Sequence, residues 1–272
     1  MISIPIAANI PTHYHQLSLF WANHKDVYGN AAKDKAHAAI VLQEPNHPDW
    51  QLGIPNTIVK DCHSYHKLPK EGGIVPLNIQ IALQQILHQF NDTDILELLD
   101  CDMFHLRPAP DYNPGEKEFF INDIYEDWHL KSLTDNKHII QPYLKNDTGY
   151  LGGFVPIIGQ TQTFKIILED WIQTHISIYK AHPNNHLTRW WAGMYSFQTA
   201  CANNNIKMTA KNNCYIPNVN NLEDHHYITH YCCDDKHFNK KIALQNINSV
   251  NIENLPDNLF YNKIKEYIVS LK

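Results

Sequence analysis

Two aspartates one residue apart, Asp100 and Asp102, follow the apolar run ILELL at residues 95–99. Side chains two positions apart in a strand point the same way, so the two carboxylates are expected to converge just past the end of a buried strand. Two carboxylates a few Å apart repel each other unless a cation neutralises them. A hard divalent ion with free coordination positions suits such a pair, and it can then bind a diphosphate. The pair therefore predicts a metal site at the edge of a nucleotide site.

The D-x-D spacing alone is weak evidence, because it recurs in this chain at Asp92-Thr93-Asp94. That second pair precedes the strand and is typical of the end of a helix. For Asp100 and Asp102, a turn with two exposed carboxylates is the alternative interpretation. The preceding strand and the following Met103-Phe104 favour the site.

The elements that must position this pair alternate along the chain. Short apolar runs predict strands at residues 2–6, 38–42, 57–59 and 95–99. Apolar residues at helical spacing predict helices at residues 17–24, 79–90, 164–175 and 190–201. Strands that follow helices in this way are typical of an α/β fold with a mostly parallel sheet, in which ligands bind outside the carboxyl ends of the strands.

The boundaries of these elements carry further signals. Thr161 or Thr163 is expected to cap the N-terminus of the helix at 164–175. The asparagine run 203–205 is expected to end the helix at 190–201. The C-terminal part is rich in asparagine and has no clear periodicity. No internal repeat or linker is visible. We therefore expect a single domain at 1–272, with a nucleotide-binding half at about 1–110 and an acceptor half at about 111–272.

Composition narrows the class of protein. The chain has 272 residues, of which 43% are hydrophobic and 18% charged, as expected for a folded globular protein. The net charge of −6 without a basic block argues against nucleic-acid binding. No signal peptide is visible, and no apolar run approaches the roughly 20 residues that span a bilayer. The chain is therefore expected to be cytoplasmic and without a membrane span.

Cysteine and histidine are the other residue types that bind metals. None of the six cysteines stands in a C-x-x-C pair, so reduced thiols are expected, with a reactive Cys232-Cys233 pair as the alternative. The H-x-x-x-H spacing from His226 to His230 suits zinc on a helix. The intervening Tyr227-Ile228-Thr229 favours a strand, in which residues 226, 228 and 230 align instead.

The order of several segments is more specific than any single motif. It runs ILELLDCDMFHLRP, YLGGFVPIIG, RWWAGMYSFQTACANNNIK and HHYITHYCCDDKHFNKK. This order resembles the GT-A-type, metal-dependent nucleotide-sugar glycosyltransferases. Within them it is most similar to the plant peptidyl hydroxyproline arabinosyltransferases and peptidyl-serine galactosyltransferases. The resemblance covers roughly residues 76–240 and implies a GT-A-like, Rossmann-like, mostly parallel central sheet flanked by helices.

The resemblance also implies roles for individual residues. Asp102 matches the aspartate of the acidic motif and Asp100 its partner. His230, in the late His-Tyr pair that is trailed by Asp235, is implied as the third protein ligand of Mn²⁺ or Mg²⁺. The nucleotide and its phosphates are implied to lie near Ala7, Ala8, Asn9, Asp61, Asn78, Cys101 and Lys236, with Lys240 or Lys241 as alternatives to Lys236. The residues implied at the reacting sugar are Asp100, Asp102, Gly153, Trp190 and Tyr195.

Two positions leave alternatives open. Gly152-Gly153 would allow close backbone approach to the donor sugar, or would be a simple strand bulge. Gly193 stands where the family's W-x-x-E-M-Y helix has its glutamate. It would border the acceptor side of the cleft, or would only permit tight packing. Hydroxyproline recognition is therefore not implied for this chain.

The function expected from these observations is transfer of a sugar from a UDP-sugar to an unidentified glycan, peptide or small-molecule acceptor. The transfer is expected to depend on a metal and to retain the anomeric configuration. Two alternatives remain open. One is a non-catalytic module that binds nucleotide sugars or glycans. The other is a metal-dependent phosphoesterase, which would need a second metal ion and more ligands.

Overall fold

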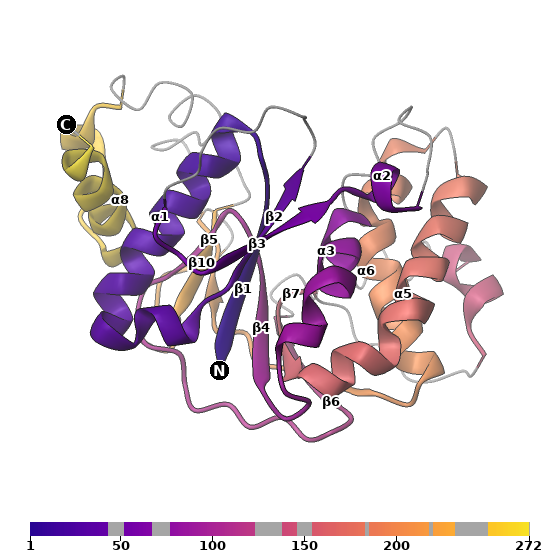
Figure 1. Cartoon of the computed structure of the whole chain (residues 1–272). Helices are drawn as coiled ribbons and strands as arrows, with labels where there is room; N and C mark the ends of the chain where they lie inside the picture. Colours follow the sequence, from indigo (N-terminus) through magenta and orange to yellow (C-terminus); the bar gives the residue numbers. More distant parts are fainter. Residues whose placement is uncertain are drawn as a thin grey trace.

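The computed structural model of this protein describes residues 1–42, 52–66, 77–122, 138–145, 154–182, 185–217, 220–231 and 250–271. Within these residues, a seven-stranded sheet forms the middle layer and helices cover both of its faces (Figure 1). A smaller three-stranded sheet lies beside it. The expected mixed α/β architecture is confirmed.

The central sheet has the strand order β3-β2-β1-β4-β7-β6-β8. Its strands are β1 (Ile2–Ala8), β2 (Ala38–Leu42), β3 (Asn56–Lys60), β4 (Ile95–Asp100), β6 (Glu118–Asn122), β7 (Phe154–Gln160) and β8 (Lys207–Ala210). The first four strands are mutually parallel, and β6 is parallel to β8. Only β7 runs antiparallel to its neighbours, β4 and β6. The sheet is therefore mostly parallel, as the sequence predicted.

Helices on the two faces bury the predicted apolar stripes. The helices are α1 (Pro11–Tyr28), α2 (Cys62–His66), α3 (Asn78–Ile86), α5 (Thr161–Ala181), α6 (His186–Asn203) and α8 (Leu259–Ser270). Figure 1 shows α1 and α8 on one side of the sheet and α3, α5 and α6 on the other. The short 3₁₀ turns are η1 (Gly29–Lys35), η3 (Leu87–Gln89), η4 (Gln141–Tyr143) and η6 (Ile252–Asn254).

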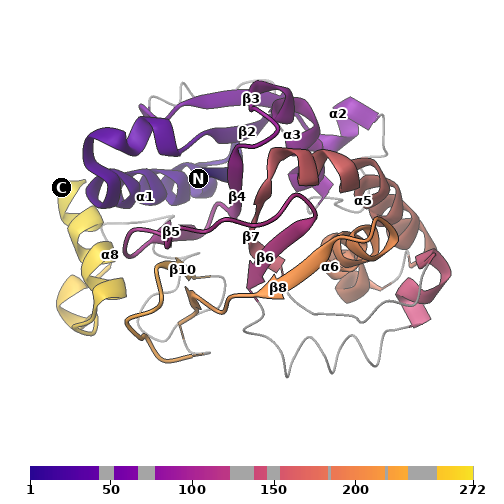
Figure 2. The same cartoon turned by 90° about the horizontal axis from the view of Figure 1, so that it is seen from below.

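The small sheet consists of β5 (Met103–His105), β10 (Ile228–His230) and β9 (Cys214–Tyr215), in the order β5-β10-β9. β5 and β10 pair antiparallel, with His230 opposite Met103. Figure 2 shows β5 and β10 next to each other below α1. This pairing brings a late segment of the chain onto the residues that follow β4, and the sequence patterns did not predict it.

Two apolar clusters hold the layers together. The main cluster contains fully buried aromatic side chains such as Phe20, Phe104, Phe119 and Trp171. Each of them stabilises the fold by about 1.5–3 kcal/mol through burial. A second cluster contains Ile139, Ile140, Ile178, Trp191, Ala192 and Tyr195. The face expected for 164–175 is buried throughout, because α5 packs on both the sheet and α6.

One boundary prediction is wrong. Neither Thr161 nor Thr163 caps α5: the N-cap is Gln160, and its side chain makes no capping bond. The two threonine hydroxyls instead donate to the carbonyl oxygens of Asp94 and Glu116. The hydroxyls therefore bond to carbonyl oxygens of distant segments and do not cap the helix. The C-terminal part, which has no clear period in sequence, contains α8, whose Phe260, Tyr261, Ile264, Tyr267 and Ile268 are buried.

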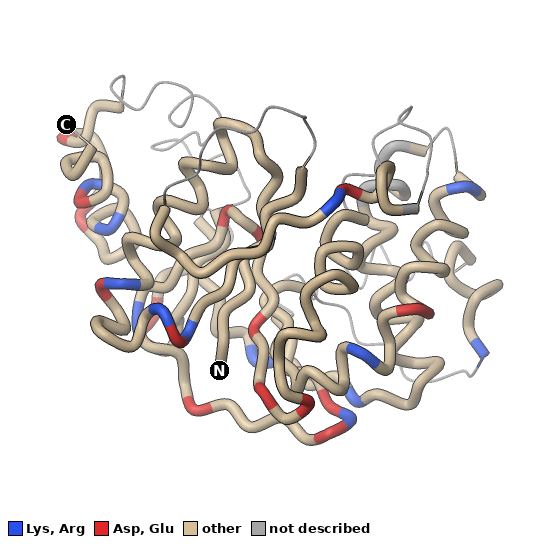
Figure 3. The backbone as a smooth tube through the Cα atoms, in the orientation of Figure 1, with Lys and Arg blue, Asp and Glu red and all other residues tan. Residues whose placement is uncertain are grey.

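Charged residues are dispersed along the described chain. Figure 3 shows Lys and Arg positions interspersed with Asp and Glu over the helices and loops. None of the described helices is long and apolar enough to cross a membrane.

Candidate functional site

The candidate site lies where four parallel strands end. Because β3, β2, β1 and β4 are neighbours and parallel, their carboxyl ends share one edge of the central sheet. Ile6 of β1 stands opposite Asp100, so Ala7 and Ala8 continue β1 just beyond it. Ligands of open α/β sheets bind at such edges.

A turn brings Asp100 and Asp102 together. β4 ends at Asp100, the chain turns at Cys101 and Asp102, and β5 begins at Met103. The expected convergence of the two carboxylates is confirmed. It arises from this turn, and not from the alternation of side chains along one strand that the spacing suggested.

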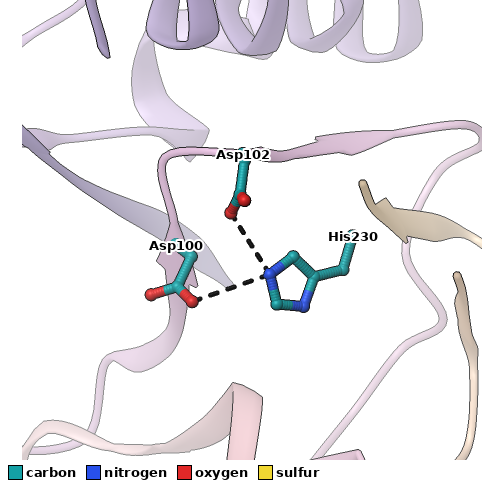
Figure 4. A group of neighbouring side chains, drawn as sticks. All are labelled: Asp100, Asp102 and His230. Atoms are coloured by element: carbon teal, nitrogen blue, oxygen red, sulfur yellow. Dashed lines mark ion pairs between the residues drawn. The ribbon is translucent and has the colours of Figure 1, made fainter. Parts of the chain in front are cut away.

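His230 completes the cluster from the second sheet. Its position follows from the pairing of β10 with β5, which the Tyr231 amide extends by donating to the Asp102 carbonyl oxygen at 3.1 Å. The His230 Nε2 atom lies 3.2 Å from Asp102 Oδ1 and 3.7 Å from Asp100 Oδ2 (Figure 4). One ligand atom from each of the three residues lies within 4.8 Å of the others.

The donor set suits a divalent cation. An ion with bonds of about 2.1 Å holds its ligand atoms roughly 3–4 Å apart, and His230 Nε2 lies at 3.2 and 3.7 Å from the two carboxylates. Two carboxylates and an imidazole match the preferences of Mn²⁺ or Mg²⁺ better than those of a soft metal. Asp102 and His230 are buried, whereas the Asp100 side chain is 30% exposed. One side of the cluster therefore remains open to a ligand.

The acidic groups next to the cluster remain neutral. Burial, followed by the negative charge of Asp102, raises the pKa of Tyr231 well above its usual value. Burial also raises the pKa of Cys214, with Glu97 and Asp102 adding to the effect. Neither group therefore adds negative charge beside Asp100 and Asp102.

The residues expected around the nucleotide line the same edge. Ala7, Ala8 and Asn9 are buried at the end of β1. The Ala8 amide donates to His13 Nδ1 at 2.9 Å, and the Asn9 amide donates to the Val41 carbonyl oxygen at 3.0 Å. These bonds tie the end of β1 to the start of α1 and to the end of β2.

Asp61 and Asn78 hold the neighbouring turn. Asp61 follows β3, and its Oδ1 accepts from the Ser64 amide at 2.8 Å, in the first turn of α2. Asn78 begins α3, and its Oδ1 accepts from the Cys62 amide at 2.9 Å. In the described contacts these two side chains therefore accept hydrogen bonds from backbone amides of α2. Their expected contact with the nucleotide remains a prediction.

Cys101 lies between the two aspartates, with a buried partner. Its thiol donates to Gln16 Oε1 of α1 at 3.0 Å. Gln16 and His13 were not among the residues predicted from sequence. Their polar side chains near the start of a helix that directly follows β1 were a usable signal, because such helix starts adjoin nucleotide sites in parallel sheets.

The remaining expected residues lie elsewhere or outside the described part. Tyr195 of α6 is 2% exposed and packs in the second apolar cluster, where its ring stands edge-on to Trp191. Trp190 belongs to α6, and its side chain is not among those described. Gly153 and Lys236 lie outside the described residues, as do Lys240, Lys241 and the Cys232-Cys233 pair. The roles expected for all of them stay predictions.

Gly193 lies buried where α5 packs on α6. Its carbonyl oxygen accepts from Trp171 Nε1 of α5 at 2.9 Å and from Ser196 Oγ at 3.0 Å. These contacts favour the packing interpretation over a place at the acceptor side of a cleft.

No family model and no curated protein matches this sequence. Among solved structures, the chain is similar to the galactosyltransferase LgtC in complex with donor and acceptor sugar analogues. The sequence identity is 10%, the TM-score is 0.56, and the match covers 99% of this chain and 96% of that chain. An active-site mutant of LgtC matches with 10% identity and a TM-score of 0.52, over 94% of this chain and 98% of that chain.

These comparisons concern the fold. The narrower resemblance to the plant arabinosyl- and galactosyltransferases is supported by none of them and stays a prediction. The mostly parallel central sheet flanked by helices corresponds to that of LgtC over nearly the whole length of both chains. The chain therefore has a GT-A glycosyltransferase fold.

Proposed function

We propose that this protein is a glycosyltransferase that takes a sugar from a UDP-sugar donor and depends on a divalent cation. The fold supports this proposal, because the structure it resembles is that of a galactosyltransferase bound to donor and acceptor sugar analogues. The acceptor is a glycan, a peptide or a small molecule. Retention of anomeric configuration is part of the proposal, as the sequence resemblance to the arabinosyl- and galactosyltransferases implies.

A single observation carries the proposal. Asp100, Asp102 and His230 present three ligand atoms within 4.8 Å of one another at the carboxyl edge of the parallel strands. A diphosphate can be bound at such an edge only if the carboxylates next to it are neutralised. Within the described residues this is the one group of its kind, and it supplies the ligands for a single ion.

Each residue has a distinct task in the proposed site. Asp100, Asp102 and His230 would hold Mn²⁺ or Mg²⁺, which supplies a Lewis acid for the leaving diphosphate. Ala7, Ala8 and Asn9 would leave room for the nucleotide beside β1, since the first two have small side chains. Lys236 would add positive charge at the phosphates, as its place in the sequence motif suggests.

A donor-hydrolysis assay tests the function. The purified chain is incubated with a panel of UDP-sugars and Mn²⁺, and release of UDP is followed without an acceptor. We expect slow release from one or a few sugars, loss of release in excess EDTA, and loss in His230→Ala. Controls use the wild-type chain with simple phosphate esters and with UDP alone.

The outcomes separate the alternatives. Release of phosphate from simple esters would support a phosphoesterase instead. Binding of UDP-sugar that saturates without any release would support a binding module. Full activity in excess EDTA would refute the role of the cation while leaving transfer itself possible.

A further inference from the structure

A buried carboxylate in β4, Glu97, contacts three polar groups. The Ser3 hydroxyl donates to Oε2 at 2.7 Å, the Tyr227 hydroxyl donates to Oε1 at 2.7 Å, and His105 Nε2 lies 3.0 Å from Oε2. All four side chains are buried. Burial alone would raise the pKa of Glu97, but the charge of His105 and the three hydrogen bonds lower it below its usual value. The carboxylate is therefore ionised and held through both oxygens.

Three of these residues stand in a regular relation to the candidate metal site. We define the buried triad as Glu97, His105 and Tyr227. Each member lies on one of the three segments that carry a candidate ligand, and it lies three positions from that ligand. Glu97 precedes Asp100 in β4, and Tyr227 precedes His230 of β10. His105 of β5 follows Asp102.

The triad joins two sheets that are otherwise paired separately. Asp100 belongs to the central sheet, whereas His230 belongs to the small sheet. The pairing of β10 with β5 fixes His230 relative to Met103, and the two-residue turn at Cys101 and Asp102 links Met103 to β4. His105 bonds to Glu97 from β5 of the small sheet, and Tyr227 bonds to it from the residue directly before β10. Hydrogen bonds to a buried ionised group are among the strongest in proteins.

We propose that the buried triad positions the candidate metal ligands by locking the small sheet against β4, so that His230 stays within reach of both aspartates. The inference rests on the proposed function, because it assigns these residues to the same cation site. The triad residues act through the strands and do not touch the cation. Metal sites respond strongly to such support, since a small shift of one ligand weakens every bond to the ion.

Metal affinity tests the proposal on the full chain. Tyr227→Phe removes one hydroxyl and keeps the ring, and Glu97→Gln keeps the shape but removes the charge. We expect each variant to bind Mn²⁺ about tenfold more weakly than wild type, as measured by calorimetry with Mn²⁺ alone. Because both changes break the same contact, the double variant should lose less than the product of the two single losses.

Tyr267→Phe in α8 is the matched control. Tyr267 is also buried, and its hydroxyl donates to the His15 carbonyl oxygen at 3.4 Å, a contact that involves no member of the triad. It should lower the midpoint of thermal unfolding without a change in Mn²⁺ affinity. If Tyr227→Phe and Glu97→Gln behave like this control, the triad is only structural and the inference is wrong.

His230→Ala separates this result from a failure of the proposed function. If wild type binds Mn²⁺, and His230→Ala abolishes binding while the triad variants keep it, only the positioning role is overturned. If wild type does not bind Mn²⁺, or His230→Ala binds it as tightly as wild type, both the metal site and the positioning role are overturned.

Discussion

His230 reaches the candidate site from a segment far along the chain, and its imidazole contacts both aspartates. The three side chains differ in exposure: Asp102 and His230 are buried, and Asp100 is partly open to solvent. A buried carboxylate is costly unless it is paired, so Asp102 depends most on a positive partner. The rate of the expected reaction should accordingly depend most strongly on the carboxylate of Asp102.

Replacing Asp102 with alanine tests this sensitivity. Loss of one carboxylate from the ion that binds the diphosphate should lower the rate of UDP-sugar hydrolysis by about a hundredfold or more. The far-ultraviolet circular dichroism spectrum should remain that of wild type. Unchanged turnover in Asp102→Ala would contradict the proposed role of the acidic pair.

Asp92→Ala is the control for this change. Asp92 belongs to the other D-x-D pair, and its side chain is 62% exposed in an ion pair with Lys165 at 2.7 Å. Exposed ion pairs contribute little to stability, commonly about 0–1 kcal/mol. Activity and stability should therefore stay close to wild type in Asp92→Ala.

At the contact between α5 and α6, the sequence differs from the motif of the family that it resembles. The family that the chain resembles has a glutamate at the position of Gly193. Here that position is buried, and its carbonyl oxygen accepts from the Trp171 indole. Glycine within a helix costs roughly 0.5–1 kcal/mol relative to alanine. Close packing of α6 on α5 would offset this cost.

Gly193→Glu tests this packing role. A carboxylate placed between the two helices would lose its hydration without a cationic partner, so the free energy of unfolding should fall by about 2–4 kcal/mol. Donor hydrolysis and transfer should decrease together. Thermal unfolding and both activities are measured on the same preparation.

Gln162→Glu is the matched control, because it places the same carboxylate at an exposed position in the first turn of α5. It should leave stability within about 0.5 kcal/mol of wild type. If Gly193→Glu is as stable as this control and loses only transfer to the acceptor, the glycine borders the acceptor instead.

The molecule as a whole buries several ionisable groups whose protonation differs between the folded and unfolded chain. Burial, with the nearby His105 adding to it, lowers the pKa of His24 to about 3. Burial lowers the pKa of His175 to about 3 as well. The pKa of Glu97 is also below its usual value. All three shifts act on stability in the same direction, since each group binds a proton more readily in the unfolded chain.

Stability should therefore fall in acid. For His24 and His175 the stabilisation is complete above an unfolded pKa of about 6.5 and is lost as the pH falls towards 3. Each histidine contributes a slope of about 1.4 kcal/mol per pH unit in this window. Glu97 adds to the loss only below its ordinary pKa of 4.5. Denaturant unfolding at a series of pH values measures the slope.

His24→Gln should lower the slope between pH 6 and 5 by about 1 kcal/mol per pH unit, even though it also changes packing against Phe20. A stability that does not change between pH 7 and 5 would show that these buried histidines are not linked to folding.

Much of the architecture follows from local patterns. The run AAIVL coincides with β2, and the apolar stripe at 164–175 is the buried face of α5. Asn203 and Asn204 end α6, as the asparagine run predicted. Period and polarity are sufficient here because each of these elements buries one continuous face. α8 was missed, since its buried residues lie among many polar ones in an asparagine-rich stretch.

The sequence patterns predicted that the acidic pair follows a buried strand. They also predicted that this strand belongs to a mostly parallel sheet. Only the tertiary structure decided how His230 reaches that pair and how Glu97, inside an otherwise apolar strand, is satisfied. The physical reason is that a local pattern encodes which side of an element is buried. It does not encode which distant element covers that side. The pairing of β5 with β10 and the bonds of the buried triad depend on that choice, because their partners lie on segments far apart in the chain.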